Sequence, residues 1–337
     1  MLKALCNAFG VSGCEDEVRK LILAEISDYC DSIETDSMGN LICFKKGSSI
    51  YRNKIMLTAH MDEVGLIVTD VTKDGHLRFK TVGGVDARVL IGKRVIVNKT
   101  VGVIGDIPPH LNDGKSENAA KIKDLYIDIG AKDEEEAKKY VSLGDYAVFD
   151  SEYVEFGNRL IKAKALDDRI GCDILIQLAK NSYPNDIYFV FTVQEEVGCR
   201  GAAIAAYSVK PDIAVVVEAT TCSDVAGTSE EGFATKLRHG AALSIMDGGS
   251  YSDASLRKEL YSTAIENDIK VQFKQTSFGG NDAAAIHLSQ TGVKTAVVSV
   301  PCRYIHSASC VACIDDIQSC RDILDKFLVK ERAEWSF

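Results

Sequence analysis

Carboxylates and imidazoles recur along this chain at the ends of apolar, strand-like runs. The side chains in these positions are His60, Asp62, Asp167, Glu195, Glu196, Glu218 and His306. Imidazole nitrogen and carboxylate oxygen are donors that zinc, cobalt and manganese accept. Each short motif alone is weak evidence, but together they predict a metal site that the fold assembles from distant segments.

The number and type of these donors predict a catalytic site with two metal ions. His60, His306, Asp167, Glu196 and Glu218 supply two imidazoles and three carboxylates. If Asp167 bridges the ions, each ion receives one imidazole, one terminal carboxylate and the shared carboxylate, with positions open for water and substrate. A structural zinc site would instead be closed and usually rich in cysteine. Two ions of zinc, cobalt or manganese would activate a hydroxide and polarise a carbonyl, as hydrolysis of an amide requires.

Two further motifs suggest supporting roles. Asp62 follows His60 by two residues, so in a strand both side chains face the same way and Asp62 can accept the second N–H of the imidazole. Glu195 and Glu196 are adjacent and would face opposite ways in a strand. One of them can therefore bind metal while the other serves as general base and acid.

Helices and apolar strands frame these side chains. The segment EDEVRKLILAEISDY places Val18, Leu21, Ile22 and Ile26 on one face, which predicts an amphipathic helix. IMLTAHM is apolar enough for a buried strand. From about Ala165 onward, helical segments alternate with apolar strands, which is typical of a sheet covered by helices.

The middle of the chain has a different pattern. Short strands are broken there by Asp-Gly and Gly-Gly pairs, which predicts a small β-barrel or sandwich, and the run from Asp145 to Ala165 belongs to this pattern. We expect residues 1–68 and 161–337 to form one α/β domain and residues 69–160 to form a β domain inserted into it.

Composition indicates a globular protein in a reducing compartment. The 337 residues carry a net charge of -10, which argues against nucleic acid and anionic membranes as partners. No apolar run is long enough for a membrane span, and the first residues do not form a secretory signal, so we expect a cytoplasmic protein. The eleven cysteines favour reduced thiols. Cys310 and Cys313 form a CxxC pair, but no second pair completes a zinc site.

Several longer motifs resemble the M42 family of metallo-aminopeptidases, which includes glutamyl and tetrahedral aminopeptidases and relatives labelled endoglucanase or cellulase. The resemblance covers nearly the whole chain and implies a phosphorylase/hydrolase-like α/β/α sandwich with an inserted, PDZ-like β-barrel for dimerisation. It also implies dimers that assemble into a tetrahedral dodecamer enclosing the active sites. The motifs are AHMDEVGLIV, GGVDARVLIGKRV, IDIGAKDEEEA, LGDYAVF, KALDDRIGC, TVQEEVGCRGA, FGGNDAAAIH and PCRYIHS.

The resemblance implies a role for most of the candidate residues. Glu195 would be the general base, and Asp62 would support the histidine, whereas Asp168 receives no role. Many relatives have Asp at the position of Glu218, and the motif usually seen as G-G-T-D reads G-G-N-D at 279–282. The metal ligands implied are His60 and Glu218 for one ion, Glu196 and His306 for the other, and Asp167 as the bridge.

These observations predict an aminopeptidase that removes N-terminal residues from peptides, with Glu195 moving a proton to the leaving amine. A noncatalytic binding or assembly protein with the same fold is one alternative. It predicts a broken ligand set, whereas every ligand position carries a suitable donor. A glycoside hydrolase is a second alternative, but that chemistry needs two carboxylates around a sugar and no paired metals. The preferred N-terminal residue stays open, because the residues of its pocket carry no local signature.

Overall fold

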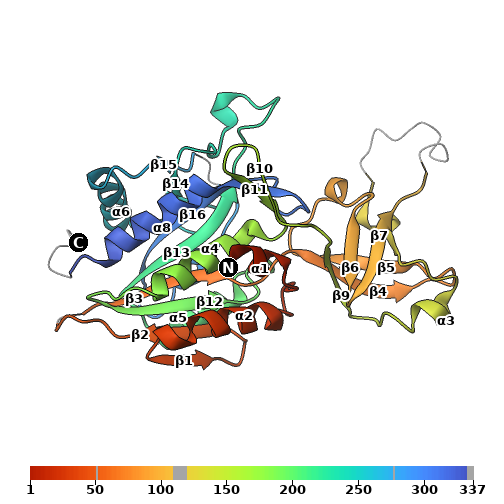
Figure 1. Ribbon diagram of the computed structural model, residues 1–337, viewed down its shortest axis with the longest axis horizontal. Coiled ribbons are helices and arrows are strands. Elements are labelled where there is room, and N and C mark those ends of the chain that lie inside the picture. Colours follow the sequence, from red (N-terminus) through yellow and green to blue (C-terminus); the bar gives the residue numbers. More distant parts are fainter. Residues whose placement is uncertain (51, 109–119, 276–277, 332–337) are drawn as a thin grey trace.

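A helix-covered sheet and a closed barrel set beside it make up the computed structural model of the chain (Figure 1). The structure describes every residue except 51, 109–119, 276–277 and 332–337. The large sheet has eleven strands. They are β1 (Ser32–Thr35), β2 (Leu41–Lys45), β3 (Lys54–His60), β10 (Val154–Phe156), β11 (Leu160–Ala163), β12 (Asp186–Thr192), β13 (Ile213–Thr221), β14 (Ala241–Leu243), β15 (Val271–Phe273), β16 (Lys294–Arg303) and β17 (Cys310–Cys313).

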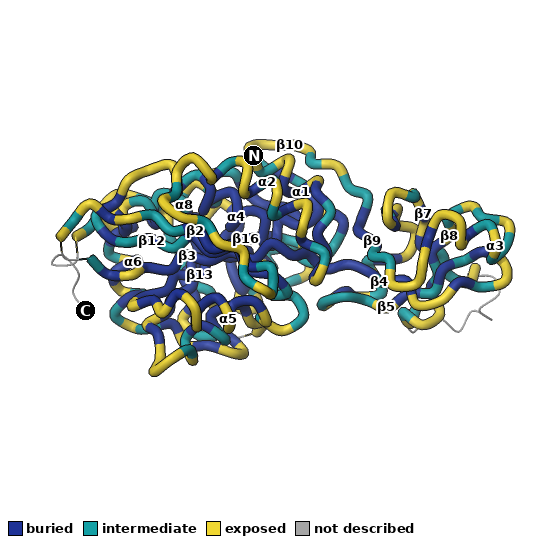
Figure 2. The backbone as a smooth tube through the Cα atoms, turned by 90° about the horizontal axis from the view of Figure 1, so that it is seen from below, coloured by how far each residue is buried: buried dark blue, intermediate teal, exposed yellow. Residues whose placement is uncertain are grey.

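Helices pack on both faces of this sheet, and one short helix belongs to the barrel. Both bodies have a buried interior, which Figure 2 shows as dark segments of the tube. The helices are α1 (Leu2–Asn7), α2 (Asp16–Ile26), α3 (Glu134–Ala137), α4 (Leu166–Ala179), α5 (Arg200–Val209), α6 (Ala254–Glu266), α7 (Ala283–Ile286) and α8 (Ile314–Leu328).

Parallel strands form the centre of the sheet, in the order β12, β3, β13 and β16. Successive residues of a strand face opposite sides of the sheet. Ile55 and Leu57 of β3 accordingly pack with residues of α2, α4 and α8, whereas Met56 packs on the other face with α5 and α7. This burial on both faces explains why IMLTA is apolar at almost every position, and it confirms the predicted α/β/α sandwich.

The first long helix has the predicted amphipathic burial. Val18, Ile22 and Ile26 of α2 are fully buried, and Leu21 packs partly against the same core. The acidic residues Asp16 and Glu17 stand in its first turn, where the helix dipole favours negative charge.

A buried ionic cluster connects the N-terminal segment to the residues at the start of α4. Lys164 and Arg169 both contact Oε1 of Glu63, at 2.6 and 3.3 Å. Lys164 also donates to the carbonyl of Ala8, and Arg169 donates to that of Leu5. Each of the three charged side chains is at most 4% exposed. The segment after α1 is therefore held by charges that lie beside the start of α4.

Six strands close the barrel in the order β4 (Gly65–Val71), β5 (Leu77–Val82), β8 (Tyr126–Asp128), β7 (Thr100–Gly105), β6 (Arg94–Val97) and β9 (Tyr146–Phe149). Strands β10 and β11, which the sequence pattern placed in the barrel, instead extend the large sheet beside β17. The prediction for these two strands is wrong because strand periodicity does not say which sheet a strand joins. The domain limits at 69 and 160 stay a prediction.

Among the described helices, none combines the length and the apolar character that crossing a membrane requires.

Candidate metal centre

The candidate residues gather where the parallel strands end. His60 is the last residue of β3, and Glu195 and Glu196 lie in the loop that follows β12. Glu218 lies inside β13 rather than at its end, where the sequence placed it, and His306 lies in the turn between β16 and β17. Carboxyl ends of parallel strands share one edge of a sheet, so residues distant in sequence meet there.

Asp167, at the start of α4, is the centre of the group. Its Oδ1 lies 3.2 Å from Nε2 of His60, and its Oδ2 lies 3.3 Å from Nε2 of His306. The peptide bond between Asp167 and Asp168 is cis. Because the two oxygens of one carboxylate face different imidazoles, Asp167 has the placement that a bridging ligand requires.

A terminal carboxylate accompanies each imidazole. Oε1 of Glu218 lies 3.4 Å from Nε2 of His60, and Oε2 of Glu196 lies 3.1 Å from Nε2 of His306. The structure thus brings the five expected ligands together as two groups that share Asp167. The grouping is the one that the family resemblance implies.

Asp62 is fully buried and connects His60 to the loop after β12. Its Oδ1 lies 3.4 Å from Nδ1 of His60 and accepts the backbone N–H of Glu195 at 3.0 Å. Its Oδ2 accepts the N–H of Glu196 at 3.1 Å and the hydroxyl of Ser12 at 2.6 Å. One carboxylate therefore positions an imidazole and the backbone of both glutamates.

The two glutamates point to different groups, but not for the predicted reason. Both lie beyond the end of β12, so the alternation of strand residues does not apply to them. Oε2 of Glu195 lies 3.9 Å from Nε2 of His60, whereas Glu196 contacts His306. The loop conformation separates them.

The barrel contributes one contact to the site. The backbone carbonyl of Gly84, in the loop after β5, lies 2.9 Å from Nδ1 of His306. A Cβ on Gly84 would come within 3.3 Å of the same nitrogen, so the loop approaches the ring closely. A carbonyl at Nδ1 selects the tautomer that leaves Nε2 free to bind a metal.

Burial and mutual charge shift the pKa values of the central groups. Burial alone would raise the pKa of Asp167, but hydrogen bonds from His306 and His60 outweigh it and hold that pKa far below its ordinary value. Burial likewise opposes charge on His306, yet Asp167 and Glu196 raise the pKa of this imidazole to about 11. The pKa of His60 is raised for the same kind of reason, with the charge of Glu218 as the largest favourable influence.

Glu195 has a pKa suited to proton transfer. Burial raises the pKa of its carboxyl to about 8, against the lowering effect of His60 and with the help of the charges on Asp282, Glu196 and Asp167. A general base works best when its pKa lies near the working pH. In the metal-free protein, the position and the raised pKa of Glu195 both fit the role of acid and base.

The donor set fits divalent metal ions. The donors are carboxylate and imidazole only, and Oε1 of Glu196 is buried without a hydrogen-bond partner. Buried polar atoms in native proteins are nearly always satisfied. Two sets of donors close enough to hold one ion contain His60 with Asp167 and Glu196, and His60 with Asp168 and Glu218. A cation would satisfy the unpaired oxygen and offset the repulsion between the neighbouring carboxylates.

Three neighbours of the site had no role assigned from the sequence, although Asp168 stands beside Asp167 in the motif KALDDR. Asp168 accepts the backbone N–H groups of His60 and Gly171 and so fixes the strand end from below. Cys199 and Asp282 lie beside Glu195. Both lie within the family motifs TVQEEVGCRGA and FGGNDAAAIH, which was the available signal.

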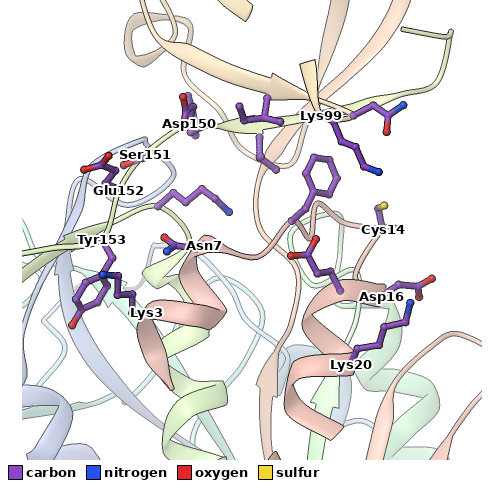
Figure 3. A pocket seen from close by; sticks show the side chains of 17 residues that line it. Lys3, Asn7, Cys14, Asp16, Lys20, Lys99, Asp150, Ser151, Glu152 and Tyr153 are labelled. Carbon is purple, nitrogen blue, oxygen red and sulfur yellow. The ribbon is translucent and has the colours of Figure 1, made fainter. Parts of the chain in front are cut away.

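A wide hollow lies away from these residues. It encloses about 1010 Å³ between the N-terminal helices and the barrel, with Lys3 and Asn7 on one wall and Lys99 and Asp150 on the other (Figure 3). None of the expected metal ligands lines it. A much smaller space of about 10 Å³ lies against Asp167, Glu196 and His306. The donor groups, and not the size of a cavity, therefore indicate where the candidate active site lies.

An α/β/α sandwich with two imidazoles on either side of one carboxylate at its strand ends fits a hydrolase with a candidate metal site. The family model described as M42 glutamyl aminopeptidase matches residues 39–323. A putative aminopeptidase from Acetivibrio thermocellus is 40% identical over 328 residues, which cover 96% of each chain. The chain belongs to the M42 family and is an aminopeptidase, a hydrolase of peptides.

Solved structures agree with this assignment. Aminopeptidase APDkam598 from Desulfurococcus kamchatkensis is 36% identical, covers 99% of this chain and 95% of its own, and superposes with a TM-score of 0.95. The TET1 peptidase of Pyrococcus horikoshii is 33% identical over 98% of both chains, with a TM-score of 0.87, and can assemble into a tetrahedron or a large octahedral shell.

Proposed function

We propose that this chain is a binuclear aminopeptidase that uses two divalent ions of zinc, cobalt or manganese to remove N-terminal residues from peptides. The observation that carries the proposal is the position of Asp167, whose two oxygens face the Nε2 atoms of two imidazoles. His60 and Glu218 would hold one ion, and His306 and Glu196 the other. When bound, two ions held by these residues would activate water and polarise the scissile carbonyl.

Side chains of the protein would transfer the proton of the attacking water. Glu195 stands 3.9 Å from His60, at the edge of the ligand group, with a pKa of about 8. Its carboxylate would accept a proton from the attacking water and pass it to the leaving amine, which needs one to depart. Asp62 would hold the loop so that Glu195 keeps this position, through the hydrogen bond from its backbone N–H.

Glu195→Gln tests this assignment. The substitution keeps the size and polar character of the side chain but removes the proton acceptor, so turnover should fall by at least about a hundredfold. Metal content, measured by elemental analysis, should stay at two ions per chain. Glu155→Gln, at an exposed strand residue, is the control and should leave turnover unchanged. Retained activity in Glu195→Gln would contradict the role of base.

A second experiment separates the alternatives. Protein stripped with a chelator is offered a panel of aminoacyl arylamides after separate addition of zinc, cobalt or manganese. Restored cleavage supports the aminopeptidase and reports the preferred metal and N-terminal residue. A noncatalytic protein would stay inactive with every metal, and a glycosidase would release sugar from β-glucan without metal.

We propose further that residues 69–160 form a dimerisation domain and that dimers assemble into a dodecamer in the cytoplasm. The TET1 peptidase of Pyrococcus horikoshii supports assembly by analogy. Val101 and Val103 of β7 are 54% and 45% exposed on the outside of the barrel, where a partner chain could cover them. All eleven cysteines are free, as a reducing compartment favours.

A further inference from the structure

A second cluster of donors lies beside the proposed metal centre. Glu195, Cys199 and Asp282 each offer one ligand atom, and these atoms lie within 4.8 Å of one another. They come from the loop after β12, the residue before α5 and the residue before α7. Cys199 and Asp282 take no part in the proposed reaction, so their position needs a separate explanation.

Asp282 provides the observation that points to a ligand. It is 1% exposed. Thr192 donates to Oδ2 through its hydroxyl at 2.5 Å, and this contact fixes the carboxylate. Oδ1 is buried and has no hydrogen-bond partner. A buried carboxylate oxygen without a partner is costly, and a cation beside it would remove that cost.

Cys199 determines which cations would fit. Its Sγ lies 3.5 Å from Oε1 of Glu195, and the residue is half-buried, so solution can reach it. Sulfur with two carboxylates favours zinc and cobalt over manganese and magnesium, because thiolate is a soft ligand. The other oxygen of Glu195 is the one that lies 3.9 Å from His60. Glu195 therefore stands between the proposed catalytic centre and this cluster.

We propose that Glu195, Cys199 and Asp282 form a third, inhibitory site for a thiophilic divalent cation such as zinc or cobalt. The inhibition rests on the proposed function, because it follows from the role of Glu195 as base. Binding displaces the thiol proton of Cys199 to solvent and engages Oε1 of Glu195. A carboxylate held by a cation is a poorer proton acceptor, so occupation of this site stops turnover while the catalytic ions remain in place.

Cobalt(II) chloride added without oxygen to metal-stripped protein tests the site directly. The two catalytic positions contain no sulfur, so the first two equivalents should give only weak ligand-field bands. A third equivalent should add an intense thiolate-to-cobalt charge-transfer band. Cys199→Ala should abolish this band, and Asp282→Asn should weaken binding of the third ion by about tenfold or more.

Cys222→Ala is the matched control. Sγ of Cys222 also lies beside a carboxylate, 2.8 Å from Oδ1 of Asp224, but Arg303 already neutralises that group at 2.6 Å. This variant should keep the charge-transfer band. Survival of the band in Cys199→Ala, or a third equivalent that binds without any such band, would overturn the proposal.

Inhibition is measured on each variant relative to its own uninhibited rate. Excess zinc should inhibit the wild type strongly and excess manganese only weakly. Cys199→Ala should raise the zinc concentration for half-inhibition by about tenfold or more. Equal inhibition of wild type and variant would count against the site. Failure of the first two cobalt equivalents to bind would instead contradict the paired metal centre, so the two proposals fail in different ways.

Discussion

At the scale of single residues, Asp167 and its two histidines set the protonation of the metal-free site. The pKa of His306 is raised to about 11, so this imidazole keeps its proton at neutral pH in the absence of metal. A group with a raised folded-state pKa stabilises the fold below its ordinary pKa, and that contribution is lost as the pH rises through the folded value. The protonated ring therefore stabilises the metal-free protein at neutral pH and must release its proton when metal binds.

Metal affinity should consequently rise with pH. Between about pH 6 and about pH 9 His306 keeps its proton until a cation displaces it. Each binding event therefore releases protons, and apparent affinity increases as the free proton concentration falls. Chelator competition at several pH values measures the affinity, and calorimetry in buffers of different ionisation enthalpy counts the protons. Affinity that is independent of pH would contradict the raised pKa values.

The candidate ligands could be proposed from the sequence because their types and family motifs are local signals. The closeness of Cys199 and Asp282 to Glu195 could not, since it depends on the conformation of the loop between β12 and α5 and on where that loop meets the residue before α7. Ser12 is a similar case. Its hydroxyl donates to Asp62, which lies 50 residues further along the chain, and no local sequence pattern predicts that contact.

At the scale of elements, the loop after β5 supports the site from the barrel side. Gly84→Ala would place a Cβ 3.3 Å from Nδ1 of His306, so the ring must move by a few tenths of an ångström. We expect metal affinity to fall by about tenfold, because groups that orient a ligand matter nearly as much as the ligand. A dye-competition titration measures this.

Gly232→Ala is the control for that change. Its new Cβ would meet the side-chain methyl of Thr228 at 3.1 Å and Oγ of Ser229 at 3.9 Å, in a turn that holds none of the candidate ligands. This variant should bind metal like the wild type. Equal losses in both variants would mean that the effect at Gly84 is general destabilisation.

The charged cluster under the N-terminal segment makes a second element-scale prediction. Glu63→Gln leaves Lys164 and Arg169 buried without their counter-charge, and removing one partner of a buried pair costs about 3–5 kcal/mol. Glu25→Gln breaks the exposed pair with Lys180, 3.4 Å apart, and should cost less than about 1 kcal/mol. Urea unfolding of both variants measures the two losses in the free energy of unfolding. Similar losses in both variants would contradict the prediction.

At the scale of the whole molecule, the sequence predicted the sandwich and the barrel but not their junction. Apolar strands such as β3 have a pattern that identifies burial on both faces, so the layers could be predicted. Strands β10 and β11 alternate equally well in either sheet. The pairing of β11 with β17 places both strands in the large sheet, and the two paired segments lie far apart in the sequence.

The assembled state is the prediction at this scale. Twelve copies of the 36.6 kDa chain give a particle of about 440 kDa, which light scattering or mass photometry can weigh. Replacing both Val101 and Val103 by Asp should lower that mass, because charge on a covered apolar surface opposes association. A wild-type particle with the mass of one chain would contradict the assembly.

The hydrogen-bonding contact between Gly84 and His306 also bears on how this architecture can change over time. A barrel that served only for contact between subunits could be deleted, or replaced by another domain, without effect on the site. Here the inserted segment orients a candidate ligand of the catalytic body. Any domain that replaces the barrel must therefore place a backbone carbonyl beside Nδ1 of His306. We expect the barrel and the sandwich to change together, in evolution and in engineering.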